Sequence, residues 1–334
     1  MHTTLIRTAV AALLAAGALG QALAQSEPAP EYPRPPKASK PYRIGVALPQ
    51  LTPHFIGQAY GYADEAKALG ATVRILDSGG YQFLDKQISQ VEDLIASKVD
   101  AIILVAANSQ GTVGVVDEAV KAGIPVINCN VMTDSTKVVS RVRSDDVDIG
   151  TTQADYLGKA LGGKGNVVML RGAPGTSWAV NRGDAFKKRM AAAYPGIKIL
   201  GEQYNQSTPP DGLKLMEDMM QTYPKIDAAY TGSDPTGIGA AQAVMAAGQG
   251  GKVIITTTDM QPDTEKLIRE GMLSASVAQQ SVVLGRWCMR VAINHLDKRP
   301  VPAVLTTPVV VISKENVAKA DLSGLRAPAG WKIP

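Results

Sequence analysis

Aromatic residues make up only 5% of this 334-residue chain, and it has just three His and two Cys. One of the three histidines, His2, stands at the extreme N-terminus. The other two histidines and the two cysteines lack the spacing of a metal site. The sequence has no GxSxG or GxxxxGK[ST] motif, and Gln242 stands where a GxGxxG motif after Gly237 needs its third glycine. We therefore expect no enzyme activity, no metal and no cofactor.

The chain also lacks an excess of charge of one sign. It has 34 Lys+Arg against 30 Asp+Glu, a formal net charge of +4, and no basic run. This balance argues against a nucleic-acid partner. With 45% hydrophobic and 19% charged residues, the composition is that of a folded chain, and the length predicts two domains.

Long apolar runs are absent beyond the N-terminus, so no later segment is expected to span a membrane. Residues 1–24 have the pattern of a secretory signal peptide, with Arg7 before an apolar run over 9–19 and small residues at Ala22 and Ala24. We expect export to the periplasm. Residues 25–40 contain five prolines and are expected to form a flexible linker.

The two cysteines, Cys129 and Cys288, would then lie in an oxidising compartment. Cys129 ends an apolar strand segment and Cys288 lies in the middle of a helical one. One disulfide is possible, but two cysteines do not make a disulfide framework. We favour two buried thiols, because free Cys is among the most buried residue types.

Short apolar runs alternate with amphipathic segments along the chain. The helical face in 81–98 illustrates the second kind, because Leu84, Ile88, Val91 and Ile95 are spaced by four, three and four. The expected strands are 42–48, 71–77, 101–105, 124–129, 167–171, 197–204, 228–231 and 253–257. The expected helices are 54–69, 81–98, 111–122, 177–193, one after Pro210, 236–247 and 263–270. This alternation predicts parallel sheets covered by helices, in two similar Rossmann-like α/β lobes.

The segments that follow these strands are unusually polar. They contain His54-Phe55, Asn108, Asn128-Cys129-Asn130, Ser233-Asp234 and Asp259. In open parallel sheets, ligands bind beyond the carboxyl ends of the strands. We therefore expect a ligand cleft where these loops of the two lobes face each other.

Four longer phrases carry a family resemblance. They are ILVAANSQGTVGVVDEAVKAGIPVI, RGAPGTSWAVNRGDAF, YTGSDPTGIGAA and IITTTDMQPDTEKLIREGMLSASVAQ. They resemble the type I periplasmic binding proteins, the ribose-binding-protein-like solute receptors of ABC importers, over residues 42–314. The resemblance implies a three-segment hinge, with crossings near Val131, Gln279 and Pro308. It divides the chain into an N-terminal lobe, 41–131 plus 280–308, and a C-terminal lobe, 132–279 plus 309–334.

Other phrases are similar to a subgroup of the family. ILDSGGYQFLDKQISQVEDL and TTPVVVISKENVAKADLSGLRAPAGW resemble the periplasmic binding proteins that sense trimethylamine N-oxide beside a membrane histidine kinase. That subgroup reads its ligand with an aromatic box, of which only Phe55 is matched here. Asp146 and Asp259 stand where further aromatics are expected, and a carboxylate supplies no π face for a quaternary-amine-like ligand.

The ribose-type binding pattern is matched in part. Asn108 stands at the place of an acidic hydroxyl acceptor, Asp234 at that of the second residue of an Asn-Asp pair, and Asp259 and Gln279 at those of an Asp and a Gln. The two arginines that bind sugar hydroxyls are absent, although Arg182 lies two residues beyond one of their places. The departure argues against ribose itself and favours another neutral sugar or polyol.

A polyhydroxyl ligand suits these residue types. Carboxylates and amides exchange hydrogen bonds with hydroxyl groups, and aromatic faces cover the C–H surface of a sugar ring. The candidate ligand-binding residues are Asp259, Asn108, Gln279, Phe55, Asn130, Trp178, Asp234, Arg182, His54 and Tyr81.

Structural roles are open for several of these candidates. Asp259, Asn108 and Asp234 stand where each could instead cap a helix, the role we favour for Asp234, and Arg182 could instead form an ion pair between the lobes. We expect a monomeric receptor that closes on its ligand by a hinge motion and delivers it to an ABC permease, with a sensor kinase as the alternative partner.

Overall fold

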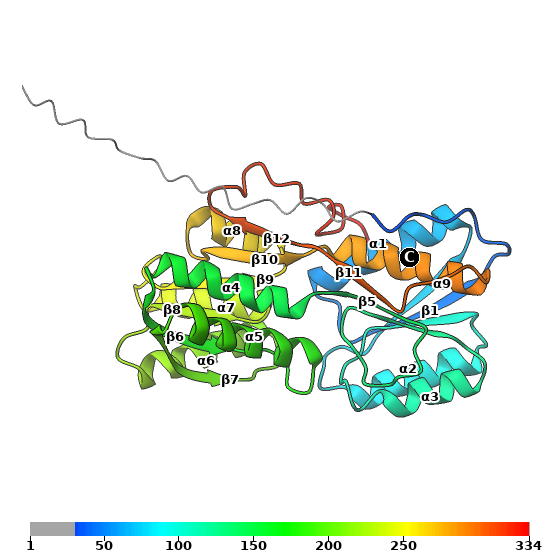
Figure 1. The fold of residues 1–334 in the computed structure, drawn as a ribbon, viewed down its shortest axis with the longest axis horizontal. Coiled ribbons are helices and arrows are strands. Elements are labelled where there is room, and N and C mark those ends of the chain that lie inside the picture. The colour runs from blue at the N-terminus through cyan, green and yellow to red at the C-terminus, as the bar shows by residue number, and fades with distance from the viewer. Residues whose placement is uncertain (1–30, 334) are drawn as a thin grey trace, which may run out of the picture.

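The computed structural model describes residues 31–333, which form two lobes arranged along the long axis of the molecule (Figure 1). The predicted signal peptide, 1–24, lies outside the described residues. Each lobe is built on one six-stranded sheet. Across 31–333, every helix is too short or too polar to cross a membrane.

The first sheet is parallel throughout, with the strand order β11-β5-β4-β3-β1-β2. Its strands are β1 (Arg43–Leu48), β2 (Thr72–Asp77), β3 (Ala101–Leu104), β4 (Val126–Cys129), β5 (Ser140–Ser144) and β11 (Val304–Thr307). Helices α1 (Pro53–Leu69) and α9 (Ser281–Leu296) cover one face, and α2 (Leu84–Ala96) and α3 (Val113–Lys121) the other. In β3, Ile103 packs with the first pair of helices and Ile102 with the second, because successive side chains of a strand point to opposite faces.

The second sheet has the order β12-β10-β9-β8-β6-β7, and only β12 runs antiparallel to its neighbour. Its strands are β6 (Lys164–Leu170), β7 (Gly196–Gln203), β8 (Ala228–Thr231), β9 (Ile254–Thr258), β10 (Ala275–Gln279) and β12 (Val309–Ser313). Helices α4 (Asp146–Ala160) and α5 (Ser177–Ala193) cover one face, and α6 (Pro209–Thr222), α7 (Asp234–Ala246) and α8 (Pro262–Glu270) the other. The prediction of two similar α/β lobes is confirmed.

The first crossing between the lobes differs from its predicted place near Val131. β5 pairs with β4 in the first sheet, so the chain leaves that sheet after Ser144. The later crossings follow β10 and β11. In β5 the inward side chains are Ser140, Val142 and Ser144, so only one of its five residues is apolar. The sequence therefore shows no apolar run that would indicate a strand here.

Residues 31–40 form no helix or strand, as a linker would, but they are not free of the fold. The Tyr32 ring packs edge-on against Trp287 at 6.2 Å between centroids, and Arg34 pairs with Glu65 at 2.7 Å. This part of the predicted flexible linker is therefore tied down on α1 and α9 by a buried carboxylate and an aromatic contact.

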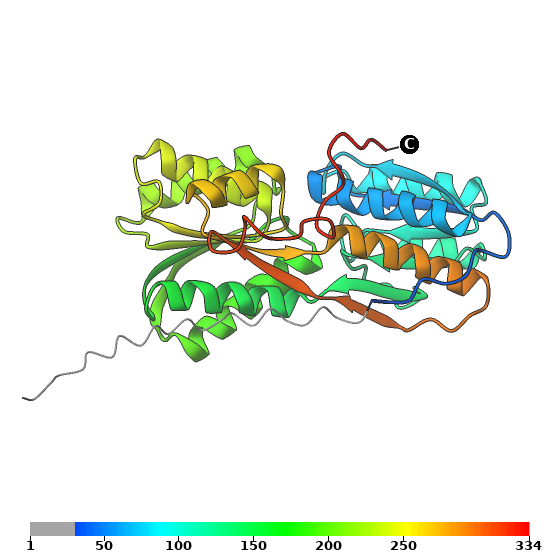
Figure 2. The ribbon, with the colours of Figure 1, turned by 90° about the horizontal axis from the view of Figure 1, so that it is seen from above.

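The C-terminal residues do not stay with the second lobe, to which we assigned 309–334. Beyond β12 the chain returns to the first lobe (Figure 2). Arg326 still pairs with Glu265 of α8 at 2.6 Å, whereas Gly324 accepts a hydrogen bond from Val282 N of α9 at 3.1 Å. The ring centroid of Trp331 lies 5.5 Å from that of Tyr60 on α1, so the C-terminal segment contacts both lobes.

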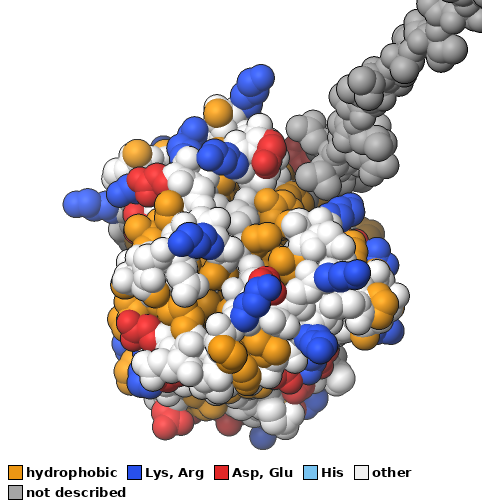
Figure 3. Space-filling view, turned by 90° about the vertical axis from the view of Figure 1, so that its left-hand side faces the viewer, with side chains coloured by type: hydrophobic (Ala, Val, Ile, Leu, Met, Phe, Trp, Pro, Cys, Tyr) orange, Lys and Arg blue, Asp and Glu red, His pale blue; other side chains and the backbone are white. Residues whose placement is uncertain are grey.

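The far end of the second lobe mixes charges of both signs. Figure 3 shows Lys and Arg side chains interspersed with Asp and Glu and with small apolar areas. Among the described residues, this face thus carries no continuous basic stripe of the kind that binds nucleic-acid phosphates.

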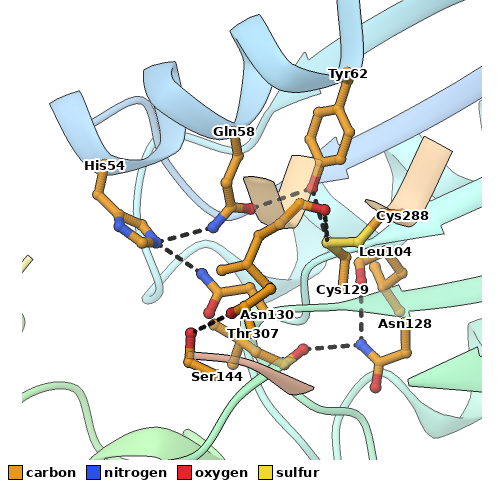
Figure 4. The surroundings of a disulfide bond; sticks show 12 residues. His54, Gln58, Tyr62, Leu104, Asn128, Cys129, Asn130, Ser144, Cys288 and Thr307 are labelled. Atoms are coloured by element: carbon orange, nitrogen blue, oxygen red, sulfur yellow. Dashed lines mark hydrogen bonds between the residues drawn. A yellow bond between two sulfur atoms is a disulfide. The ribbon is translucent and has the colours of Figure 1, made fainter. Parts of the chain in front are cut away.

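The expectation of two separate thiols is wrong. Cys129 at the end of β4 and Cys288 of α9 form a disulfide, and both are buried in the first lobe (Figure 4). Helix α9 lies close to α1 because glycines meet there: a Cβ on Gly285 would lie 2.3 Å from Gln58 O. The spacing of the two cysteines in the sequence, 159 residues, gave no sign that a late helix returns to the first sheet.

Reducing this disulfide is expected to lower the free energy of unfolding by about 2–4 kcal/mol, because the bond closes a long loop in the unfolded chain. Urea unfolding with and without dithiothreitol measures the change. A Cys129→Ala/Cys288→Ala variant should match the reduced wild type and respond no further to dithiothreitol. Equal stability of the oxidised and reduced protein would contradict the prediction.

Candidate functional site

A cleft lies where the carboxyl ends of the two sheets face each other. The first lobe contributes the start of α1 and the end of β4, and the second contributes the start of α5 and the ends of β9 and β10. The lining residues are Gln50, Thr52, His54, Phe55, Tyr81, Asn130, Val131, Trp178, Arg182, Ser207, Ser233, Pro235, Asp259 and Gln279. The position is the one expected for a ligand site in open parallel sheets.

Eight of the ten candidate residues meet in this cleft. They are His54, Phe55, Tyr81, Asn130, Trp178, Arg182, Asp259 and Gln279. His54 and Asp259, which are 205 positions apart in the chain, thus line the same cleft.

Asn108 and Asp234 do not line the cleft, and both take up structural roles. The Asn108 side-chain oxygen accepts a hydrogen bond from Gly111 N at 2.8 Å, which closes the turn before α3. Asp234 accepts from Gln261 N at 2.7 Å and so ties the start of α7 to the start of α8. Each contact satisfies a backbone donor, half-buried at Gly111 and buried at Gln261. Neither residue caps a helix as its alternative role would require, because the N-caps of α3 and α7 are Thr112 and Ser233.

Some lining residues were not among the candidates. Gln50 and Thr52 follow β1, and Ser207 follows β7 within the run Asn205-Gln206-Ser207-Thr208. The signal that indicated the other residues, a polar segment directly after a strand, was present at both places. Ser207 is also one of the lining residues with a left-handed backbone, as are Asn130 and Asp259, at φ of 59°, 60° and 83°. Such strained positions cluster at binding sites.

Asp259 is the centre of the polar network. Its Oδ1 atom lies 3.0 Å from Nδ1 of His54, across the cleft, and accepts a hydrogen bond from Gln279 Nε2 at 2.8 Å. Burial alone would raise the pKa of Asp259, but His54, Arg182 and Gln279 together hold that pKa below its ordinary value. Asp259 is therefore a buried carboxylate. Burial raises the pKa of Asp234 well above its usual range, and the negative charge of Asp259 raises it further.

Arg182 forms a second buried pair, with Asp146. The guanidinium Nε donates to Asp146 Oδ1 at 2.8 Å, and Nη1 donates to Gly232 O at 3.1 Å. Burial alone would lower the pKa of Arg182, but the carboxylates of Asp146 and Asp259 raise it, so the side chain stays charged. Asp146 begins α4 and Arg182 lies on α5, so the pair lies within the second lobe and does not join the lobes.

Aromatic rings form one side of the cleft. Phe55 and Tyr81 of the first lobe lie 6.5 Å apart between centroids, and Tyr81 lies 6.1 Å from Trp178 of the second lobe. The Arg182 guanidinium stands 5.1 Å from the centre of the Trp178 ring. The cleft therefore combines apolar faces with charged and amide groups.

Three lining groups are buried without a hydrogen-bond partner. They are Oε1 of Gln279, whose amide nitrogen already donates to Asp259, Oγ of Ser207 and Nε1 of Trp178. A buried polar atom without a partner costs about 1–3 kcal/mol. Groups of this kind are suited to a ligand that brings hydroxyl donors and acceptors.

Direct contacts between the lobes surround the cleft. Met132 N donates to Ser177 Oγ at 3.1 Å, and Ser109 N donates to Gly175 O at 3.1 Å. These two contacts join loops of the first lobe to the segment at the start of α5, and the His54–Asp259 pair joins α1 to the end of β9. Over the described part of the chain, 31–333, no three His, Cys, Asp or Glu side chains group as they would around a metal ion.

Comparison with known proteins identifies the family. The periplasmic binding protein domain matches residues 44–300, and this chain belongs to that family. It is 29% identical to the ribose import binding protein RbsB of Bacillus subtilis (strain 168), over 84% of this chain and 90% of that protein. It is 30% identical to the xylitol-binding protein of Mycolicibacterium smegmatis, over 75% of this chain and 70% of that protein.

The fold agrees with a solved member of the same class. The substrate-binding protein of a sugar ABC transport system from Bordetella parapertussis superimposes with a TM-score of 0.85 at 27% identity, covering 90% of this chain and 98% of that one. The predicted resemblance to the type I periplasmic binding proteins is thereby confirmed. A family of binding proteins is consistent with the expectation that the chain is not an enzyme.

Proposed function

We propose that this protein binds a neutral sugar or polyol in its cleft and delivers it, in the periplasm, to the membrane permease of an ABC importer. The observation that carries the proposal is the mixed lining of the cleft. Aromatic faces (Phe55, Trp178) stand beside a buried carboxylate (Asp259) and buried unpartnered oxygens of Gln279 and Ser207. A sugar presents both an apolar ring face and a set of hydroxyls, and it complements both kinds of surface.

The charged groups that line the cleft already have partners within the protein, which supports a neutral ligand. Arg182 is matched by Asp146, and Asp259 is held by hydrogen bonds from His54 and Gln279. An anion would find the only lining guanidinium among the described residues already paired. A quaternary amine would meet the carboxylate of Asp259 at a place where the sensing subgroup has an aromatic ring. Relatives named for ribose and for xylitol agree with a polyhydroxyl ligand.

Ligand capture and export are parts of the same proposal. The lobes provide groups from both sides of the cleft, so a bound sugar would stabilise the closed arrangement that a permease recognises. The signal-type pattern of 1–24 and the disulfide agree with a periplasmic location. Nothing among the described residues favours a sensor kinase over a permease.

A thermal-shift screen tests the ligand class. D-ribose, D-allose, xylitol, myo-inositol and trimethylamine N-oxide are added in turn to the purified protein. A sugar or polyol present at a hundredfold excess over its Kd should stabilise the fold by about 2.7 kcal/mol, because it binds only the native state. Stabilisation by trimethylamine N-oxide alone would overturn the proposal and support the sensing alternative.

A further inference from the structure

His54 is held by a chain of side chains that runs from the cleft into the core of the first lobe. Gln58 lies one turn after His54 on α1, and Tyr62 lies one turn after Gln58. All three are buried, and Tyr62 reaches the disulfide at Cys129 (Figure 4). Of this chain only His54 lines the cleft, so the function proposed above leaves Gln58 and Tyr62 without a role.

The orientation of the Gln58 amide follows from Tyr62. The Tyr62 hydroxyl lies 3.1 Å from Gln58 Oε1 and 3.2 Å from Cys129 Sγ. A sulfur in a disulfide has no proton to give, so the hydroxyl is the donor, and the carbonyl oxygen of Gln58 is the stronger acceptor. Burial raises the pKa of the Tyr62 phenol, which keeps this proton in place. The amide nitrogen of Gln58 therefore faces His54.

Two amide nitrogens then meet one ring nitrogen. Gln58 Nε2 lies 2.9 Å and Asn130 Nδ2 2.8 Å from Nε2 of His54. An amide nitrogen only donates, so both bonds require a lone pair on Nε2 of the ring. The ring proton must then sit on Nδ1, which lies 3.0 Å from Asp259 Oδ1 on the other lobe.

We propose that Gln58 and Tyr62 are positioning residues of the ligand site, which hold His54 as the tautomer that carries its proton on Nδ1 and donates it to Asp259. Through His54, Gln58 and Tyr62 set which oxygen of Asp259 accepts a hydrogen bond from the protein and which stays available to a ligand. They also fix the ring of His54 across the cleft. The effect on ligand binding rests on the proposed function, whereas the tautomer is a property of the protein alone.

Nitrogen-15 NMR of the purified protein, labelled at histidine and without added sugar, tests the tautomer directly. His54 should show a protonated Nδ1 and an unprotonated Nε2. Comparison with a His295→Gln variant identifies the His54 signals, because His295 is the other histidine within residues 31–333. A proton on Nε2 of His54, in either the neutral or the doubly protonated ring, would overturn the proposal.

Tyr62→Phe removes one hydroxyl and leaves the buried ring in place. Gln58 is then free to turn, so the His54 signals should change to a mixture of tautomers. The affinity for whichever of D-ribose, D-allose, xylitol or myo-inositol stabilises the wild type should fall about fivefold, the usual effect of one hydrogen bond. Gln58→Glu should add a proton at Nε2 of His54 while Nδ1 keeps its own, because a carboxylate accepts where the amide donated and Asp259 still accepts from Nδ1.

Tyr230→Phe is the matched control. Tyr230 is also fully buried, lies in β8 of the other lobe, and has a hydroxyl without a partner. This variant should keep both the His54 signals and the affinity. If Tyr62→Phe leaves the His54 signals unchanged, the positioning role is disproved even where a sugar binds. If no sugar binds but the signals shift as expected, the fault lies with the proposed function.

Discussion

Asp259→Asn is expected to weaken binding of the sugar or polyol about a hundredfold or more while the protein still folds. The carboxylate is the acceptor for both His54 Nδ1 and Gln279 Nε2. An amide has one oxygen in place of two and brings N–H groups that face other donors. Hydrogen bonds to a charged group contribute about 1.5–3 kcal/mol each, and each 1.4 kcal/mol is tenfold in affinity.

Calorimetric titration of the wild type and the variant with the sugar found in the thermal-shift screen measures this loss. Asp263→Asn is the control, because Asp263 is an exposed carboxylate four residues away in the first turn of α8. It should retain the wild-type affinity, and both variants should show the wild-type circular dichroism. Unchanged affinity in Asp259→Asn would remove this residue from the binding site.

The order of helices and strands from β1 to α8 was predictable in large part because most of these strands contain a short apolar run, such as IGVAL in β1 and VVML in β6. β3, with the sequence AIIL, is buried on both faces and stands out at once. β5, α4, β11 and β12 are not among the expected segments. β5 has one inward apolar residue, Val142, and the buried face of α4 mixes Ile149 and Leu157 with glycine and glutamine. Where Ser, Gly and Gln share the buried face, the hydrophobic periodicity is weak.

The site was predictable to the extent that it lies at strand ends. Polar residues after strands indicated Asn130 and Asp259, and the structure brings them to one cleft. The same rule did not separate a group that faces a ligand from one that ties two loops, as Asp234 does with Gln261 N. That distinction depends on which backbone donors lie nearby in the folded chain. The disulfide was not predicted for a similar reason, because 159 positions separate Cys288 of α9 from Cys129 at the end of β4.

A buried ion network also depends on distant segments. Glu65 of α1 is fully buried and accepts from Arg34 Nε at 2.7 Å and from Arg290 Nε at 2.9 Å. Arg290 of α9 is 3% exposed and pairs also with the exposed Glu31 at 2.8 Å. One carboxylate thus joins α1, α9 and the segment before β1. Its removal would leave the buried guanidinium of Arg290 with only the exposed Glu31 and the Tyr32 carbonyl as partners.

Glu65→Gln is expected to lower the free energy of unfolding by about 3–5 kcal/mol, because it breaks this pair and leaves Arg290 charged in the core. The variant keeps the shape of the side chain, so lost packing does not account for the change. Asp64→Asn is the control at the neighbouring position. Asp64 pairs with Arg286 at 2.9 Å where both side chains are about one-third exposed, and such pairs contribute about 0–1 kcal/mol. Urea unfolding near neutral pH should separate the two variants clearly, and equal stabilities would contradict the prediction.

The stability difference between the wild type and Glu65→Gln is also expected to depend on pH. Burial alone would raise the pKa of Glu65, but hydrogen bonds and charge from Arg34 and Arg290 lower it below its ordinary value of 4.5. A carboxyl whose pKa is lower in the folded state binds fewer protons there than in the unfolded chain. Its stabilisation is complete above the ordinary pKa and is lost as the pH falls through the folded pKa. The stability difference between wild type and Glu65→Gln should therefore be constant near neutral pH and shrink below about pH 4.5. A difference that persists unchanged into acid would show that packing or local backbone changes, and not the charge of Glu65, cause the loss.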